Sequence, residues 1–402
     1  MSQAACWTAW GALVALQIAH LFARQAGWVV DMRWASSQYL FSITLLGPLL
    51  AGIAAYQGRG AARLVWVLRA APVRSVVGWL RGPLGIGVTV FVAGWCAVEV
   101  VAISSGATWN LTFATVRNLV SALLGVGAYA AAGFAMGALW PRRLVPAVAM
   151  IATFALTMVA WTGLAPSLVW FGGASAGVTG TELSTAATIA RVVFDVAVVI
   201  FAMVIAARAL GADPPHVSAL VPGTVMIVAA LLSTMTQPVQ GTDMAWSCDD
   251  SVPAVCVPVD FERFLPEVKE ALALSGIAGL VSAASDRTAD ALHVDDSLLF
   301  AELDRHGIAS PNVGERVGDA IYSTLVSPGC FPADDQPVLD DAQIAASDSV
   351  NGWIAYMTMD PATLASYGVT SVTAYGAPDV QPGTPEADTF VADSLALLPA
   401  CP

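Results

Sequence analysis

The chain has 402 residues, of which 57% are hydrophobic and 12% charged, and its formal net charge is −13. This composition is too apolar for an ordinary soluble protein and indicates a membrane protein. The charge is uneven, because residues 1–239 carry a net +7 and residues 240–402 a net −20. An acidic half whose only lysine is Lys269 offers no basic stripe for phosphates, which argues against a nucleic-acid partner.

Seven segments of the first half are long and apolar enough to cross a membrane as helices, for which about 20 mainly apolar residues are needed. Their apolar runs are continuous rather than alternating, which favours helices over barrel strands. The segments cover residues 4–23, 39–56, 83–104, 118–139, 144–163, 189–208 and 219–237. The sequence therefore predicts an α-helical multi-pass membrane bundle over residues 1–239.

Arginines between the spans set the expected orientation, because short cytoplasmic loops carry an excess of positive charge. Residues 57–82 contain five arginines and no acid, and two more arginines follow the fourth span. Both segments lie inside if the N-terminus is inside, whereas Arg24 and Arg33 then fall in an outer loop. Seven spans in this orientation predict a plasma-membrane protein whose residues 240–402 are extracytoplasmic.

The three ionisable residues that stand out within the spans are Glu99, Arg191 and Asp195. A charge there costs several kcal/mol unless it is paired or hydrated. Arg191 and Asp195 are four residues apart and can share a helix face, so we interpret them as a structural pair. Glu99 has no sequence-local partner and is the better candidate for a cavity or a relay. Small residues recur in residues 125–137, where we favour close helix packing over a transport path.

Residues 240–402 are expected to form one exported domain of α-rich or mixed α/β structure. Apolar spacing predicts helices at 260–276, 296–306, 313–326, 340–358 and 386–398, and alternation predicts a strand at 367–376. Four of the six cysteines lie here, and disulfides persist in oxidising compartments. We expect Cys248 to pair with Cys256 and Cys330 with Cys401; the alternative is four reduced cysteines.

Two common catalytic signatures are missing from the sequence. A chain with one lysine, Lys269, has no phosphate-binding loop of the form G-x-x-x-x-G-K-[ST], and H-E-x-x-H does not occur. His293 to Asp296, beside His306, could form a metal site, but we favour a solvated acidic surface. No catalytic residue, metal or cofactor is therefore expected, and an extracellular hydrolase is the least favoured function.

The arginine-rich stretch RLVWVLRAAPVRSVVGWLRG, residues 63–82, has apolar residues at helical spacing on both sides of Pro72. The spacing predicts two short amphipathic helices separated by this proline. Such helices either lie on the anionic inner leaflet or dock into a groove on a cytoplasmic partner. Charge alone is compatible with both locations.

Residues 68–82 of this stretch resemble the segment that precedes the third span in type-2 ABC transporter permeases. The resemblance covers about residues 1–210, and it implies a coupling helix that docks on a separate cytoplasmic ATPase subunit. It also implies pairing with a second permease subunit, identical or different. The residues that it assigns to the ATPase contact are Leu68, Arg69, Pro72, Arg74 and Arg81.

Two features depart from that family. Only a few residues precede the first span, and a seventh span with an exported domain follows the sixth. The exported half, with Cys248 and the VCVP of residues 255–258, resembles the start of such a domain in actinobacterial membrane proteins. The sequence thus predicts the permease subunit of an ABC-type exporter. The alternative is a membrane-anchored extracytoplasmic binding or sensing protein without transport activity.

Overall fold

The computed structural model divides the chain into two compact units, Met1–Thr242 and Asp243–Pro402. The first unit thus ends close to residue 240, where the charge of the sequence changes sign. The structure describes residues 11–15, 32–64, 72–104, 111–169, 181–212, 217–241, 245–250, 254–275, 291–293, 301–304, 307–311, 318, 340–359, 364–365, 371–375, 377–381 and 384–397.

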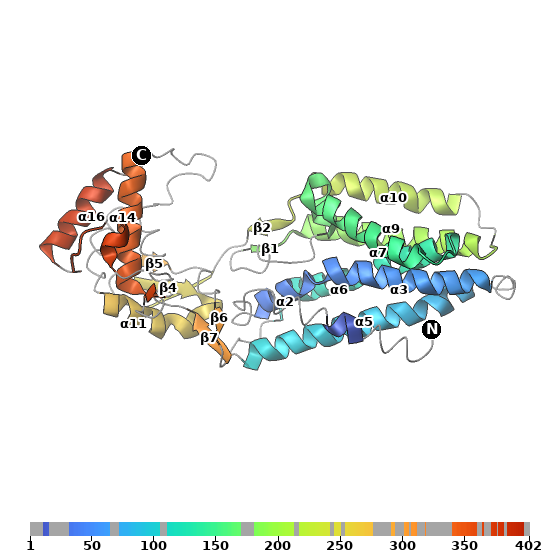
Figure 1. Ribbon diagram of the computed structural model, residues 1–402, viewed down its shortest axis with the longest axis horizontal. Coiled ribbons are helices and arrows are strands. Elements are labelled where there is room, and N and C mark those ends of the chain that lie inside the picture. Colours follow the sequence, from blue (N-terminus) through green and yellow to red (C-terminus); the bar gives the residue numbers. More distant parts are fainter. Residues whose placement is uncertain are drawn as a thin grey trace. The chain divides into compact units, whose positions relative to one another are not determined.

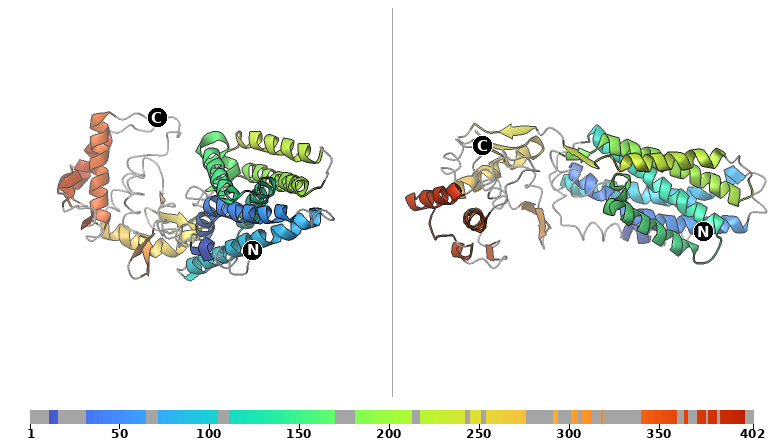
Figure 2. Two further views of the ribbon diagram at one scale, coloured as in Figure 1. Left: turned by 45° about the vertical axis from the view of Figure 1, so that its right-hand side comes forward. Right: turned by 90° about the horizontal axis from the view of Figure 1, so that it is seen from above.

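The first unit is a bundle of long helices that run side by side (Figures 1 and 2). The helices are α2 (Met32–Leu40), α3 (Ile43–Arg63), α5 (Pro72–Ser104), α6 (Phe113–Leu139), α7 (Val145–Val159) with a π-helical turn η2 (Ala160–Leu164), α8 (Pro166–Val169), α9 (Thr185–Ala209) and α10 (Val217–Ser233). Helix α6 packs against α3 and α9, and α10 packs against α9. Figure 1 shows α5 and α10 on opposite sides of this central group.

Five helical stretches among the described residues are long and apolar enough to cross a membrane, which indicates a membrane protein. They are Met32–Arg63, Val76–Ser104, Phe113–Leu139, Val145–Thr162 and Thr185–Ala209. Each coincides with or contains the greater part of one predicted span. The predicted span 219–237 corresponds to the shorter α10, and the predicted span 4–23 lies outside the described residues except for helical residues 11–15.

Helix α5 corrects part of the expectation of two short helices around Pro72, because the second is not a short helix of its own; residues 65–71, which hold most of the first, lie outside the described residues. The helix runs unbroken for 33 residues from Pro72, which is about 50 Å at about 1.5 Å per residue. Proline is favoured in the first turn of a helix, because its missing N–H has no acceptor there and its fixed φ suits the helix. Residues 72–82 are therefore the first turns of a helix longer than the hydrocarbon layer, which is about 30 Å thick.

Helices α3 and α6 approach closely because small residues face each other where they cross. A Cβ atom at Gly133 would overlap the carbonyl oxygen of Ala51, and one at Gly137 would overlap that of Ala55. Spacing of four residues on both helices keeps these contacts on one face. Close packing is thus the role of the small residues at these two positions of residues 125–137.

A short ladder joins two distant segments at one end of the bundle. Strand β1 (Thr181–Leu183) pairs antiparallel with β2 (Val239–Gly241), and Figure 1 shows both strands at the same end of the bundle as α2. Arg117 of α6 secures the ladder by donating hydrogen bonds to the Leu183 carbonyl at 2.7 Å and to Thr185 Oγ1 at 2.5 Å. The topology predicted from the arginines places the two paired segments on the same side of the membrane.

The second unit contains both helices and short strands. Strands β3 (Trp246–Cys248), β4 (Ala254–Pro258) and β5 (Ala291–His293) form one sheet, in which β3 and β4 are antiparallel and β4 and β5 parallel. A hairpin joins β6 (Ala301–Asp304) and β7 (Gly307–Pro311). The helices are η3 (Val259–Phe264), α11 (Leu265–Ser275), α14 (Asp341–Thr358), η5 (Val372–Tyr375) and α16 (Pro385–Leu397).

Two predicted elements of this unit are wrong in the described residues. The helix predicted at 296–306 contains strand β6. A short apolar run is compatible with the residue spacing of a helix or of a strand, and here its pairing with β7 makes it a strand. The strand predicted at 367–376 contains the 3-10 turn η5, where the Ser371 hydroxyl accepts the N–H of Thr373 and competes with extended backbone. The helices predicted at 340–358 and 386–398 match α14 and α16, and 313–326 lies outside the described residues except for 318.

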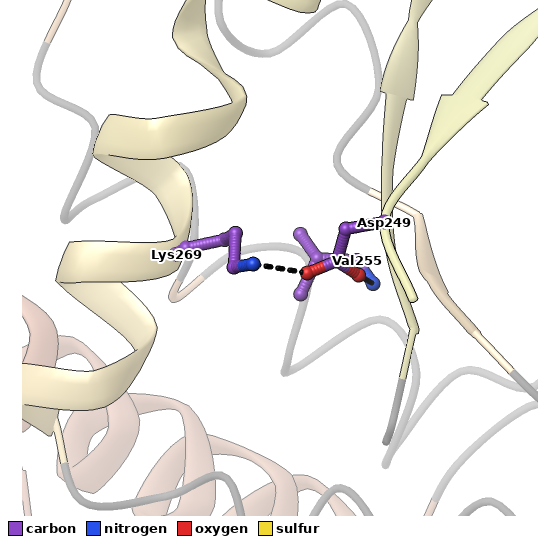
Figure 3. Close-up of polar contacts among 3 residues, drawn as sticks. All are labelled: Asp249, Val255 and Lys269. Carbon is purple, nitrogen blue, oxygen red and sulfur yellow. Dashed lines mark hydrogen bonds and ion pairs between the residues drawn. The ribbon is translucent and has the colours of Figure 1, made fainter. Parts of the chain in front are cut away.

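A disulfide and an ion pair hold the start of the second unit together. Cys248 and Cys256 form the disulfide across β3 and β4, as the sequence predicts. Asp249 accepts the Val255 N–H at 2.7 Å and contacts Lys269 Nζ at 2.7 Å (Figure 3). Because Lys269 lies on α11, this contact ties the helix to the hairpin. Cys330 and Cys401 lie outside the described residues.

Candidate functional site

Three ionisable side chains are buried within the membrane-length helices of the bundle. Glu99 of α5 is 3% exposed, and on α9 Arg191 is 1% and Asp195 5% exposed. The surrounding helices are largely apolar, and little of any of these side chains is exposed to solvent. Ionisable groups at such positions are expensive to keep and are by default candidates for function.

Glu99 belongs to a polar contact between α5 and α2. The hydroxyl of Ser36 donates to Glu99 Oε1, and Trp95 Nε1 donates to Ser36 Oγ at 3.0 Å. The Tyr39 hydroxyl adds a hydrogen bond at 2.7 Å to the carbonyl of Phe91, which lies two turns before Glu99 in α5. These contacts fix the carboxylate of Glu99 against α2, near the end of the bundle where α2 begins.

Arg191 connects α9 to α6. Its Nε and Nη2 atoms donate to Ser121 Oγ at 2.9 and 2.7 Å, and Ser121 is fully buried. Asp195 lies one turn further along the same buried face of α9, as expected of a residue four positions away. Its Oδ2 atom has no hydrogen-bond partner among the residues that the structure describes.

Tyr129 brings a third polar contact into the interior of the bundle. Its hydroxyl and Thr157 Oγ1 are 2.6 Å apart, which links α6 to α7. A Cβ atom at Gly47 of α3 would collide with the Tyr129 ring, so this glycine makes room for the tyrosine. The buried polar groups of the bundle therefore engage α2, α5, α6, α7 and α9.

A cavity of about 130 Å³ lies at the end of the bundle that carries the β1–β2 ladder. Its wall comes from α2, from the start of α6 and from β1. The polar lining residues include Arg33, Ser36, Thr112, Thr115, Asn118 and Glu182. Ser36 both lines this cavity and donates to Glu99, so the buried carboxylate lies directly behind the cavity wall.

The structure describes only some of the residues that the permease resemblance assigns to an ATPase contact. Leu68 and Arg69 lie outside the described residues. Pro72 begins α5, Arg74 follows within its first turn, and Arg81 lies exposed two turns further along. The last three positions therefore share one helix.

Sequence reasoning missed the partners of the buried charges. Ser36 is 63 residues from Glu99, and Ser121 is 70 residues from Arg191, so no local pattern connects them. The available signal was a hydroxyl residue within or beside an apolar run, which is common in membrane helices. Tyr129 could have been noticed as a polar aromatic residue in the middle of a predicted span.

Metal and nucleophile patterns add no further site among the described residues. No group of three or more His, Cys, Asp and Glu side chains that could hold a metal occurs within that part of the chain. One match to the hydrolase pattern G-x-S-x-G does exist, at Gly173–Gly177. Asp296, His306 and this pattern lie outside the described residues.

A scan against protein-family models, a search of curated proteins and a search of solved structures each find no match to this chain. The candidate site is thus defined by its own residues: the buried charges at Glu99, Arg191 and Asp195 and the polar cavity beside Ser36.

Proposed function

We propose that the chain is the permease subunit of an ABC-type exporter in the plasma membrane, with ATP hydrolysed by a separate cytoplasmic subunit. The observation that carries the transport function is the burial of Glu99 in a helix long enough to span a membrane. A bundle that served only as an anchor would have no need to keep such a costly group. The resemblance of residues 68–82 to the permease segment supports the ATPase partner.

Helix α5 gives this proposal a mechanical basis. One unbroken helix carries Arg74 and Arg81 in its first turns and Glu99 in its last two turns. A displacement imposed by an ATPase at the arginine-bearing end can therefore reach the Glu99–Ser36 contact along one continuous helix, in which Pro83 is the expected point of bending. A solute is moved only if the resulting states of the bundle bind it with different affinities.

The test is affinity purification of the intact protein from native membranes in mild detergent, with partners identified by mass spectrometry. We expect recovery of an ATPase subunit, and of a second permease subunit if the pair is heteromeric. The double variant Arg69→Glu and Arg74→Glu is expected to lose the ATPase. The matched control, Arg142→Glu and Arg143→Glu, reverses the same charge in another loop predicted to be cytoplasmic and is expected to retain the ATPase.

Equal loss of the ATPase in both double variants would show that the effect is one of general charge rather than of docking. Recovery of no ATPase with the unmodified chain, while the protein is folded and inserted, would favour the alternative of an anchored extracytoplasmic binding or sensing protein. The compact unit Asp243–Pro402 and its Cys248–Cys256 disulfide are the features in favour of that alternative.

A further inference from the structure

A groove follows the seam between α9 and α10, which lie side by side (Figure 1). It consists of two hollows of about 650 and about 300 Å³, and these adjoin because Val193 of α9 and Val225 of α10 line both. Along α9 the lining runs from Ala186 to Ile200, which is about 21 Å at about 1.5 Å per residue. Because α9 is long and apolar enough to cross a membrane, the groove faces hydrocarbon rather than water.

The two hydroxyl groups that line the groove are already engaged within the protein. Thr224 Oγ1 donates to the Leu220 carbonyl at 3.0 Å, and Thr236 Oγ1 contacts Ser167 Oγ at 3.2 Å and the Ser233 carbonyl at 3.1 Å. The other lining residues have apolar side chains. A polar ligand would therefore lose its hydrogen bonds with water and gain few in return, so the groove suits a hydrocarbon.

The floor of the groove and its rim differ in side-chain size. Ala190 and Ala197 of α9 and Ala229 of α10 are buried and form the floor. Ile189 of α9 and Leu232 of α10 are more than half exposed and form part of the rim. Small side chains thus lie below large ones on both helices.

This arrangement distinguishes a lipid chain from a helix of another subunit. Helices associate in lipid through small residues that let their backbones approach and through hydrogen bonds between polar side chains. Here the small residues lie beneath the rim, and the hydroxyls of Thr224 and Thr236 are engaged. A helix, about 10 Å wide with its side chains, would meet neither feature, whereas a single acyl chain can reach the alanine floor.

We propose that the groove between α9 and α10 binds one acyl chain of a membrane phospholipid. One leaflet of a hydrocarbon layer about 30 Å thick is about 15 Å deep, so a groove of about 21 Å is long enough for a chain of one leaflet. The bound chain covers apolar side chains of both helices and thereby stabilises α10 against α9. The site goes beyond the proposed function, and because binding requires no ATPase, either proposal can fail without the other.

The experiment is native mass spectrometry of the full-length chain, purified and delipidated in detergent, with one of two phospholipids added. Dioleoylphosphatidylcholine and dihexanoylphosphatidylcholine share a headgroup and differ in chain length, so a difference in binding reports the chains. We expect one dioleoyl lipid per chain, bound at least about tenfold more tightly than the dihexanoyl lipid, because the longer chain buries more methylene groups. Equal binding of the two lipids, or no binding of the dioleoyl lipid, would overturn the proposal.

Variants locate the bound lipid within the molecule. Val193→Trp fills the groove where the two hollows adjoin, and Ala186→Trp fills it at one end. Each is expected to weaken binding of the dioleoyl lipid by about tenfold or more. Because Val193 is 42% exposed and Ala186 is exposed, the larger side chains need not displace buried neighbours. Matched controls on α7 are Val148→Trp, at a position 48% exposed, and Ala155→Trp, which are expected to bind like the unmodified chain.

Unchanged lipid binding in both groove variants would place the lipid elsewhere and overturn the proposal. The same conclusion follows if the α7 controls weaken binding as much as the groove variants. A dimer that persists when the dioleoyl lipid is added, and that Val193→Trp dissociates, would assign the groove to a second copy of the chain instead. Circular dichroism of each variant confirms that the helices are intact, so that lost binding reports the groove and not the fold.

Discussion

Ser121 is the acceptor that makes the buried guanidinium of Arg191 tolerable in the bundle. Replacing it in Ser121→Ala leaves two N–H groups of Arg191 without that acceptor in an apolar interior. We expect the free energy of unfolding to fall by about 1 kcal/mol, which is in the range of interhelical hydrogen bonds in membranes. Unfolding of the purified protein in mixed micelles measures this change.

The control for that measurement is Thr224→Ala on α10. Thr224 is exposed and its hydroxyl donates to the Leu220 carbonyl of its own helix, so no second helix loses a contact. We expect a change within about 0.5 kcal/mol, as for surface substitutions in general. Equal destabilisation by both variants would contradict an interhelical role for Ser121.

Two side-chain contacts of Asp249 differ in their expected strength. Lys269 is half exposed, so its ion pair with Asp249 contributes at most about 1 kcal/mol. The hydrogen bond from the Val255 N–H lies beside the disulfide and is sheltered from solvent. We therefore expect amide hydrogen exchange in residues 254–258 of the intact protein to accelerate more in Asp249→Ala than in Lys269→Met. The opposite order would make the ion pair the stronger contact.

The sequence indicated the buried charges but not their surroundings. Glu99 and Asp195 are conspicuous because an acid inside an apolar run is rare and costly. The Ser36 and Ser121 contacts depend on which helix faces meet, and that is decided by packing of whole helices rather than by spacing along one of them. The cavity was unpredictable for the same reason, since Arg33, Asn118 and Glu182 meet only in three dimensions.

At the scale of elements, the crossing of α3 and α6 depends on glycine. We expect Gly137→Ala to lower the free energy of unfolding by about 1–3 kcal/mol, because its methyl group meets the Ala55 carbonyl, and backbone cannot move aside as a side chain can. Thermal unfolding of the purified protein in detergent reports the change.

Gly127→Ala is the matched control on the same helix. A Cβ atom at Gly127 would have only Leu84 Cδ1 nearby, at 4.0 Å, which is ordinary contact. Because alanine also favours the helix more than glycine does, we expect this variant to be neutral or slightly stabilising. Destabilisation by both substitutions would mean that the loss at Gly137 does not come from the α3 contact.

Helices were easier to predict than their ends or the strands. Continuous apolar runs identified α6 and α9 because burial in lipid requires the whole segment to be apolar. The length of α5 was missed because the residues after Pro72 were expected to form a short helix separate from the span 83–104, whereas they continue into it. Strand β6 was missed because its identity depends on its partner β7, which a single run of residues does not reveal.

At the scale of the whole molecule, the orientation predicted from arginines can be tested with two exposed positions. In intact cells, a membrane-impermeant maleimide should label Glu386→Cys on α16 above the level of the parent chain, because the second unit is expected outside the cytoplasm. Arg143→Cys, in the turn between α6 and α7, should be labelled only after the membrane is made permeable. Both residues are exposed in the structure, so lack of labelling reports the membrane rather than burial.

The ladder between β1 and β2 makes this test sharper, since it fixes two segments at one end of the bundle. Labelling of Arg143→Cys in intact cells, with Glu386→Cys protected, would show that the bundle has the opposite orientation in the membrane. The first turns of α5 would then face outward, where no cytoplasmic ATPase can reach Arg74, and the cavity beside Ser36 would face the cytoplasm. Labelling of both positions in intact cells would place both outside the membrane. The number of spans between them would then be even, whereas the sequence predicts an odd number. The side of the membrane on which the second unit lies therefore decides whether a cytoplasmic ATPase can reach the first turns of α5.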